Sequence, residues 1–306
     1  MTDAFLHDVL EGLGRPQKAI PPKYLYDERG SELFEAITRT KDYYVTRTEA
    51  SIMKEVHREL PSYVSERAAV AEFGSGAGVK SRSLIEAIDP AVYVAIDVAE
   101  DFLAQSTAAL QESFPNTEAI GVIADFSGDV ELPAAFMDRE TRLGFFPGST
   151  IGNFEFGGAE RFLRRSRRSF GKGAMFLLGV DLVKDEDVLL KAYDDSENVT
   201  RRFTLNLLER MKRELDADVD PSRFDHRVVW NDELSRIEIG AVSLEKQKIS
   251  VGGKTFALAE GEVIHTENSH KYTPTSFARI AGRAGWKVKD LWTDPKDWFG
   301  VFLLYD

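Results

Sequence analysis

The sequence has no cysteine among its 306 residues. Disulfide bonds, cysteine-ligated metal sites and a cysteine nucleophile are therefore excluded, and the count fits a reducing compartment. The five histidines show no spacing typical of metal ligands on one helix face, so we predict no metal site.

Long apolar runs and a secretory leader are also missing. No stretch approaches the roughly 18 consecutive apolar residues that a membrane span needs. Residues 1–14 lack the basic start and apolar block of a signal peptide. We therefore expect a cytoplasmic protein that does not associate with membranes.

Positive charge is scarcer than negative charge. The chain carries 39 Lys and Arg against 51 Asp and Glu, a net charge of -12. Because such a surface repels phosphate backbones, nucleic acid is not an expected partner. The basic run at residues 161–168 is interpreted as the solvated face of a helix.

What the chain does contain is a globular composition with a clear α/β pattern. Hydrophobic residues make up 43% of it, enough for one elaborated domain or two. Short apolar runs alternate with segments of helical spacing, which predicts a parallel sheet covered on both faces. The predicted strands are 69–73, 92–97, 119–124, 143–146, 174–180, 286–293 and 298–305, and the predicted helices are 80–88, 100–114, 159–170 and 273–284.

The α/β pattern is interrupted in its later part. Residues 184–215 look helical for a long stretch, and 227–267 have the pattern of several strands with polar turns. We predict a core of residues 47–183 and 271–306, and a second lobe of residues 1–46 and 184–270. A further helix is expected from Thr46, where Thr46 and Glu49 fit either a capping box or a solvated helix end.

A glycine-rich loop follows the first predicted strand. Glycines in Gly74-Ser75-Gly76-Ala77-Gly78 allow a tight turn and close approach of a ligand to the backbone. The loop is one residue short of the dinucleotide spacing G-x-G-x-x-G. By itself it is compatible with NAD, a flavin, S-adenosylmethionine or a plain turn.

Acidic and aromatic residues at the next strand ends favour a nucleoside-containing cofactor. Asp97 ends the second strand, where a carboxylate can accept hydrogen bonds from ribose hydroxyls. Asp125 and Phe126 end the third, where they can bind and stack on an adenine. Lys80, just past the loop, either reaches a cofactor carboxylate or is a solvated surface lysine.

The acids after the glycine loop resemble those of class I methyltransferases. Over almost the whole chain, the sequence also resembles the histidine-specific N-alpha-methyltransferases of the ergothioneine pathway. The segments that carry this likeness are 23–34, 43–49, 146–154, 191–195 and 264–272.

This resemblance implies a fold and a reaction. The fold is a Rossmann-like class I methyltransferase, with a seven-stranded sheet, a C-terminal β-hairpin and a second α+β substrate-binding lobe. The reaction is S-adenosylmethionine-dependent trimethylation of the α-amino group of L-histidine to hercynine, the first step of ergothioneine biosynthesis. A small-molecule substrate and a monomer are expected.

The resemblance also implies roles for single residues. Asn153 and Tyr193 hold the substrate carboxylate, and Glu267 with Ser269 binds the imidazole nitrogens. Tyr26 is the catalytic residue, near the amino group that is methylated. The full set of substrate-binding residues is Tyr43, Gly148, Thr150, Asn153, Tyr193, Ile239, Glu267 and Ser269. The cofactor set is Gly74, Ser75, Gly76, Lys80, Asp97, Asp125 and Phe126.

Alternatives remain open at this point. Ile239 stands where family members often carry a methionine near the substrate ring, so the same fold acting on a tryptophan- or tyrosine-like amino acid is an alternative. A cofactor-binding protein without activity is another, which tight binding without methyl transfer would support. A nucleotide-dependent oxidoreductase is a third, and the short glycine loop argues against it.

Overall fold

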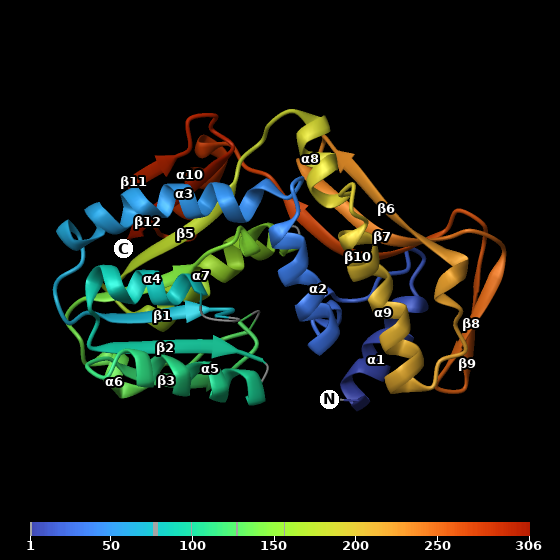
Figure 1. Ribbon diagram of the computed structural model, residues 1–306, viewed down its shortest axis with the longest axis horizontal. Coiled ribbons are helices and arrows are strands. Elements are labelled where there is room, and N and C mark those ends of the chain that lie inside the picture. Colours follow the sequence, from blue (N-terminus) through green and yellow to red (C-terminus); the bar gives the residue numbers. More distant parts are fainter. Residues whose placement is uncertain (1, 76–78, 99, 127, 156) are drawn as a thin grey trace. The chain divides into compact units, whose positions relative to one another are not determined.

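The chain divides into two compact units in its computed structural model, which describes residues 2–75, 79–98, 100–126, 128–155 and 157–306 (Figure 1). The sheet unit comprises Arg47–Val183 and Lys271–Asp306. The lobe unit comprises Met1–Thr46 and Lys184–His270. Within the described residues, no helix is long and apolar enough to cross a membrane.

The sheet unit is built on a seven-stranded sheet in the order β11-β12-β5-β4-β1-β2-β3. The five neighbouring strands β5, β4, β1, β2 and β3 run parallel, whereas β12 is antiparallel to both β5 and β11. This arrangement confirms the predicted class I methyltransferase fold with a terminal hairpin. The strands are β1 (Ala69–Phe73), β2 (Val92–Asp97), β3 (Glu118–Ile123), β4 (Arg142–Phe146), β5 (Met175–Asp181), β11 (Lys287–Thr293) and β12 (Phe299–Tyr305).

Helices cover both faces of this sheet. On one face, Phe136, Phe162 and Phe277 share a buried cluster with Ala71 and Phe73 of β1. These aromatic residues come from α6 (Ala134–Met137), α7 (Gly158–Phe170) and α10 (Pro274–Arg283). The other face is covered by α3 (Tyr44–Glu59), α4 (Val79–Ile88) and α5 (Glu100–Ser113), with the short turn η2 (Leu60–Ser62) after α3.

The strand register places the functional loops at one edge. Phe73 at the end of β1 pairs with Ile96, and Asp97 pairs with Ile123. Because the strands are parallel, the segments after β1, β2, β3 and β4 leave the same carboxyl edge. Ligands of doubly wound sheets bind along this edge.

A buried ion pair closes the carboxyl end of β5. Lys271 Nζ lies 2.7 Å from Asp181 Oδ2, and both side chains have an exposed fraction of 0%. Backbone bonds accompany the pair, since Tyr272 N–H donates to Asp181 O and Val183 N–H donates to Tyr272 O. These bonds therefore join the segment where the chain leaves the sheet unit to the segment where it returns.

The lobe unit contains a three-stranded antiparallel sheet in the order β10-β7-β6 and a separate hairpin, β8-β9. Its strands are β6 (Phe224–Asn231), β7 (Arg236–Ser243), β8 (Gln247–Val251), β9 (Lys254–Leu258) and β10 (Val263–His270). Its helices are α1 (Thr2–Leu13), α2 (Glu28–Arg39), α8 (Glu186–Tyr193) and α9 (Val199–Leu215), with turns η1 (Pro22–Leu25) and η4 (Pro221–Arg223).

The long helical stretch predicted over 184–215 is present as two helices, α8 and α9, separated by a break that the pattern did not predict. The helix stops at Tyr193 and restarts at Val199 because Asp195 competes for the backbone donors. Its buried carboxylate accepts hydrogen bonds from the N–H groups of Glu197, Val199 and Thr200. These bonds lower the pKa of Asp195 against the opposing effect of burial, which is the largest single influence.

Of the two interpretations of Thr46 and Glu49, the capping box is not formed. Helix α3 starts at Tyr44, so Thr46 lies inside the helix rather than at its cap. Glu49 is not a solvated helix end either, because only 1% of the residue is exposed. Its carboxylate has partners elsewhere in the sheet unit.

Candidate functional site

The glycine loop leaves β1 with the backbone conformation that its sequence requires. Gly74 has φ +66°, and its N–H donates to Ile96 O at 2.8 Å. Ser75 is buried, and its Oγ has no hydrogen-bond partner in the part of the chain that the structure describes. A buried hydroxyl in that condition fits a loop that holds a polar ligand. Gly76, also predicted to bind the cofactor, lies outside the described residues.

The two predicted cofactor acids end neighbouring strands. Asp97 is the last residue of β2, and its Oδ1 accepts a hydrogen bond from Val98 N–H at 2.7 Å. Asp125 is exposed just beyond β3. Phe126 packs edge-on against Phe73 and Phe146, with ring centroids 6.1 and 5.5 Å apart. The aromatic ring is thereby fixed next to the glycine loop, where its carbon lies 3.6 Å from a Cβ built on Gly74.

Lys80 is only partly solvated, because its ammonium is bonded to Glu49. Its Nζ donates to Glu49 Oε2 at 2.6 Å, and 35% of the side chain remains exposed. The ammonium therefore has one fixed partner and an accessible surface, which suits a cation that also meets an anionic ligand.

The turn after β4 carries three predicted substrate residues. Gly148 has φ +80° and Ser149 has φ +58°, so the chain reverses sharply before η3 (Thr150–Asn153). Gly148 N–H donates to Glu49 Oε1 at 2.7 Å, and Asp181 N–H donates to Ser149 Oγ at 2.9 Å. Gly148, Thr150 and Asn153 thus lie at the same edge as the glycine loop, since β4 pairs with β1.

A second buried carboxylate lies beneath this edge. Glu72 is 2% exposed and accepts hydrogen bonds from Ser81 Oγ and Tyr93 OH, each at 2.6 Å. Burial raises the pKa of Glu72 to about 7, although both hydrogen bonds and the charge of Lys80 act in the opposite direction. The side chain thus changes charge near neutral pH.

We expect Glu72 to make the sheet unit less stable as pH rises. Its folded pKa of about 7 lies above the ordinary 4.5, so its stabilising contribution is complete below 4.5 and is lost as pH rises through 7. The difference corresponds to about 3 kcal/mol. Glu72→Gln, which mimics the protonated acid, should flatten this slope and be the more stable protein at pH 8.

Urea unfolding at pH 5 and pH 8 measures this effect. Tryptophan fluorescence reports mainly on the sheet unit, which holds Trp286, Trp292 and Trp298 of the four tryptophans. Glu86→Gln, at an exposed carboxylate of α4, is the matched control and should keep the wild-type slope. An equal slope for Glu72→Gln and wild type would contradict the assignment.

The lobe unit gathers the remaining predicted substrate residues into one cluster. Tyr193 OH and Ser269 Oγ are 2.8 Å apart, and the rings of Tyr43 and Tyr193 meet edge-on at 6.0 Å. The Glu267 carboxylate and both of these tyrosines act electrostatically on Tyr26. The cluster combines one carboxylate, several hydroxyls and aromatic walls.

A β-bulge sets the direction of Glu267. In the pairing of β10 with β7, His265 pairs with Gly240 but Glu267 pairs with Ile239, so Thr266 is the extra residue. Ser269 pairs with Ile237. Because directly opposed residues share a face, Glu267, Ser269 and the buried Ile239 lie on the same side of the sheet.

Tyr26 is a neutral phenol in this setting. Partial burial of the residue is the largest cause that raises its pKa above the ordinary value, and the charge of Glu267 is the next. The residue keeps 38% exposure overall. At neutral pH it can therefore donate or accept a hydrogen bond, but it does not act as a phenolate base.

Two aromatic residues complete the cluster without having been predicted. Phe34 and Phe203 pack against Tyr26, with ring centroids 5.5 and 5.2 Å away. Phe203 lies on α9 and is 3% exposed, so its sequence signal is that of any core residue. Phe34 lies in a segment that carries the family likeness, and this was the one available hint.

His226 contacts the backbone of Tyr193. Its Nε2 lies 2.8 Å from Tyr193 O. Burial lowers the pKa of His226, while this hydrogen bond opposes the shift. The neutral ring donates from Nε2 to the carbonyl, which fixes the end of α8 where Tyr193 stands.

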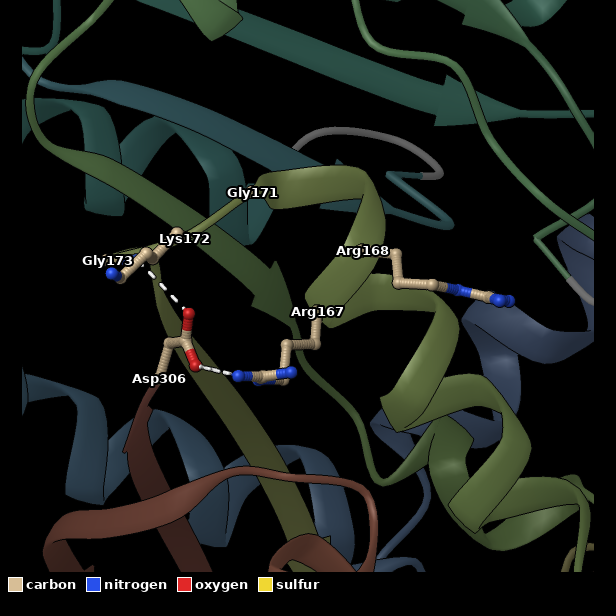
Figure 2. A pocket seen from close by; sticks show the side chains of 6 residues that line it. All are labelled: Arg167, Arg168, Gly171, Lys172, Gly173 and Asp306. Atoms are coloured by element: carbon tan, nitrogen blue, oxygen red, sulfur yellow. Dashed lines mark hydrogen bonds and ion pairs between the residues drawn. The ribbon is translucent and has the colours of Figure 1, made fainter.

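The sheet unit has a surface hollow of about 460 Å³ that does not include any of the predicted site residues. It is formed at the amino end of β5 by Arg167, Arg168, Gly171, Lys172, Gly173 and Asp306. Figure 2 shows Asp306 between Arg167 and Gly173, with Arg168 directed away. The Asp306 carboxylate already neutralises Arg167, and the hollow lies at the amino ends of the parallel strands, opposite the carboxyl edge. We therefore do not assign the hollow to the cofactor.

The predicted site residues therefore form two groups, each within one unit. The sheet unit brings together the described cofactor residues with Gly148, Thr150 and Asn153. The lobe unit brings together Tyr26, Tyr43, Tyr193, Ile239, Glu267 and Ser269. Among the described residues, no cluster of three or more His, Asp or Glu side chains could hold a metal ion.

Comparisons with known proteins cover both units. A family model described as a histidine-specific, S-adenosylmethionine-dependent methyltransferase matches residues 5–306. A histidine N-alpha-methyltransferase from Mycolicibacterium smegmatis is 36% identical over 98% of this chain and 94% of that protein. Ergothioneine biosynthesis protein 1 of Neurospora crassa is 29% identical over 94% of this chain and 33% of that protein. N-methyltransferase imqF of Aspergillus flavus is 26% identical over 96% of this chain and 83% of that protein.

Proposed function

The chain belongs to the family of histidine-specific, S-adenosylmethionine-dependent methyltransferases, and we propose that it methylates the α-amino nitrogen of L-histidine. We further propose that three methyl groups are added, giving hercynine. The likeness to a protein named for ergothioneine biosynthesis supports a place at the first step of that pathway.

The carboxyl edge of the sheet suits the cofactor. S-Adenosylmethionine supplies an electrophilic methyl group bound to a sulfonium. Asp97 would accept hydrogen bonds from the ribose, Asp125 from the adenine amino group, and Lys80 would pair with the carboxylate. The buried Ser75 hydroxyl, which has no partner among the described residues, gives the loop a further donor.

The observation that carries the substrate proposal is the group formed by Glu267 and Ser269 on β10 with Tyr193 at the end of α8. An imidazole presents two ring nitrogens, and a carboxylate with a hydroxyl on one face can engage both. Ser269 Oγ lies 2.8 Å from Tyr193 OH, and a hydroxyl, with one donor and two lone pairs, can bond more than one partner. An apolar side chain would offer no hydrogen bond to Glu267, so the carboxylate favours a polar ring.

The chain acts on the amino group mainly by placing it. Methyl transfer needs a neutral amine lone pair in line with the methyl carbon, so orientation and exclusion of water contribute most. Tyr26, kept as a neutral phenol, would accept a hydrogen bond from the amine and direct its lone pair. Asn153 and Tyr193 would donate to the substrate carboxylate without adding a charge near the sulfonium.

A methyl-transfer assay tests the proposal. Purified protein and S-adenosylmethionine are incubated with each standard amino acid, and the products are identified by mass spectrometry. We expect trimethylated histidine and little product from tryptophan or tyrosine. Transfer to another amino acid in preference to histidine would reject the substrate assignment while leaving the family unchanged.

A second candidate substrate is another aromatic amino acid. Ile239 is 3% exposed and lies directly opposite Glu267, so it shapes the wall of the same cluster. The likeness to N-methyltransferase imqF extends over both units. Comparing Glu267→Ala with wild type separates the candidates, since only imidazole recognition requires this carboxylate.

We also propose that the protein acts as a monomer in the cytoplasm. Its net charge of -12 keeps copies apart, and the absence of cysteine fits a reducing compartment. Size-exclusion chromatography with light scattering should give the mass of one 34.3 kDa chain. A dimer mass at micromolar concentration would reject the monomer.

A further inference from the structure

One buried carboxylate in the sheet unit contacts both the cofactor side and the substrate side of the edge. Glu49 on α3 accepts from Lys80 Nζ through Oε2 at 2.6 Å and from Gly148 N–H through Oε1 at 2.7 Å. Only 1% of the residue is exposed, so the carboxylate itself is shielded from bulk water. Charge-assisted bonds of this kind are about twice as strong as neutral ones.

The surrounding backbone leaves space for this carboxylate. Gly179 of β5 lies beneath it, and a Cβ there would overlap Glu49 Oε1. A Cβ on Gly148 would lie 3.2 Å from Lys80 Nζ, so the turn and the ammonium are also close to each other. Glu49, Lys80 and Gly148 therefore form one packed group rather than three separate contacts.

We propose that Glu49 is a positioning residue for methyl transfer, acting through Lys80 and the Gly148 turn. This inference rests on the proposed roles of those two residues. A lysine ammonium has three donors and no acceptor. Glu49 uses one of them and fixes the direction of the rest, so that two remain for a cofactor carboxylate. Its other oxygen sets the turn from which Thr150 and Asn153 follow.

A double-mutant cycle tests whether Glu49 acts through Lys80. The variants are Glu49→Gln, Lys80→Met and both together, and the readout is the Kd for S-adenosylhomocysteine by calorimetry. Glu49→Gln keeps an acceptor for Gly148 N–H but loses the negative charge. We expect its affinity to fall about tenfold, as when a hydrogen bond to a charged group is lost.

The decisive result is the double variant. If Glu49 acts through Lys80, adding Glu49→Gln to Lys80→Met changes Kd no further. Equal effects of Glu49→Gln in both backgrounds would mean that the two residues act independently, and the proposal would be wrong. An unchanged Kd in Glu49→Gln alone would also overturn it. Glu55→Gln, at an exposed carboxylate of the same helix bonded to Arg58, is the matched control and should bind like wild type.

The Gly148 contact is tested separately. Gly179→Ala keeps Glu49 but places a Cβ against its carboxylate and 3.1 Å from Gly148 N, so the carboxylate and the turn shift together. We expect KM for histidine to rise at least threefold more in Gly179→Ala than in Glu49→Gln. Equal KM values in the two variants would contradict the claim that Glu49 acts through the Gly148 turn. Because S-adenosylhomocysteine binding requires no methyl acceptor, the cycle remains readable even if histidine is not the substrate.

Discussion

Replacing Glu267 with alanine is expected to lower kcat/KM for histidine by about a thousandfold. A site built to hydrogen-bond a polar group loses roughly this much when the side chain that bonds it is removed. Glu267 is brought to the cluster face by the bulge at Thr266, opposite Ile239. The loss should fall on histidine and leave the Kd for S-adenosylhomocysteine unchanged, since the residue belongs to the lobe unit.

Steady-state kinetics across several amino acids measure this prediction. Glu238→Ala is the matched control, because Glu238 lies on the neighbouring strand, pairs opposite Asn268 and bonds to Arg236 at 2.7 Å. Its activity should stay within about twofold of wild type, as for most surface changes. Retention of histidine preference in Glu267→Ala would show that the imidazole is recognised elsewhere.

Replacing Lys271 with methionine is expected to cost about 4 kcal/mol of stability. Removing one partner of a buried ion pair leaves the other charge in a site without water, and the usual penalty is 3–5 kcal/mol. Both Lys271 and Asp181 have side chains with 0% exposure. For a unit of this size, the melting temperature should fall by about 10 °C.

Thermal unfolding followed by circular dichroism checks this value. Adding Asp181→Asn to Lys271→Met removes the negative charge that Lys271 compensates, so the double variant should melt above the single one. Lys289→Met is the control. Lys289 is exposed on β11, and its ammonium lies over the rings of Tyr63 and Tyr305. A Lys271→Met protein that melts within 2 °C of wild type would contradict the electrostatic account.

The sheet was predictable because its strands are buried on both faces. A parallel strand of this kind is a near-continuous apolar run, and β1 was predicted at 69–73 and found at Ala69–Phe73. The strand-end acids followed from the same reasoning, since Asp97 closes β2. Periodicity is strong evidence wherever burial alone determines the residue type.

Side-chain competition for backbone donors was not predictable in this way. Asp195 interrupts a helical pattern by capping α9, yet its sequence neighbourhood is polar on both sides of the break. Glu49 was also misjudged, because its partners Lys80 and Gly148 are 31 and 99 residues away. Local sequence holds no information about such long-range bonds. The roles of the site residues stay predictions until they are measured.

The extra residue in β10 also defines what a protein engineer could vary. In a regular strand, residues two apart share a face, but His265 and Glu267 do not, because the phase changes at Thr266. A library aimed at new amino-acid acceptors should therefore follow the pairing rather than simple alternation. Single-residue insertions or deletions near Thr266 would exchange whole sets of side chains between faces, a larger step than any substitution. Among the residues paired between β7 and β10, the positions on the Glu267 face are Ile237, Ile239, Ala241, Ile264, Glu267 and Ser269.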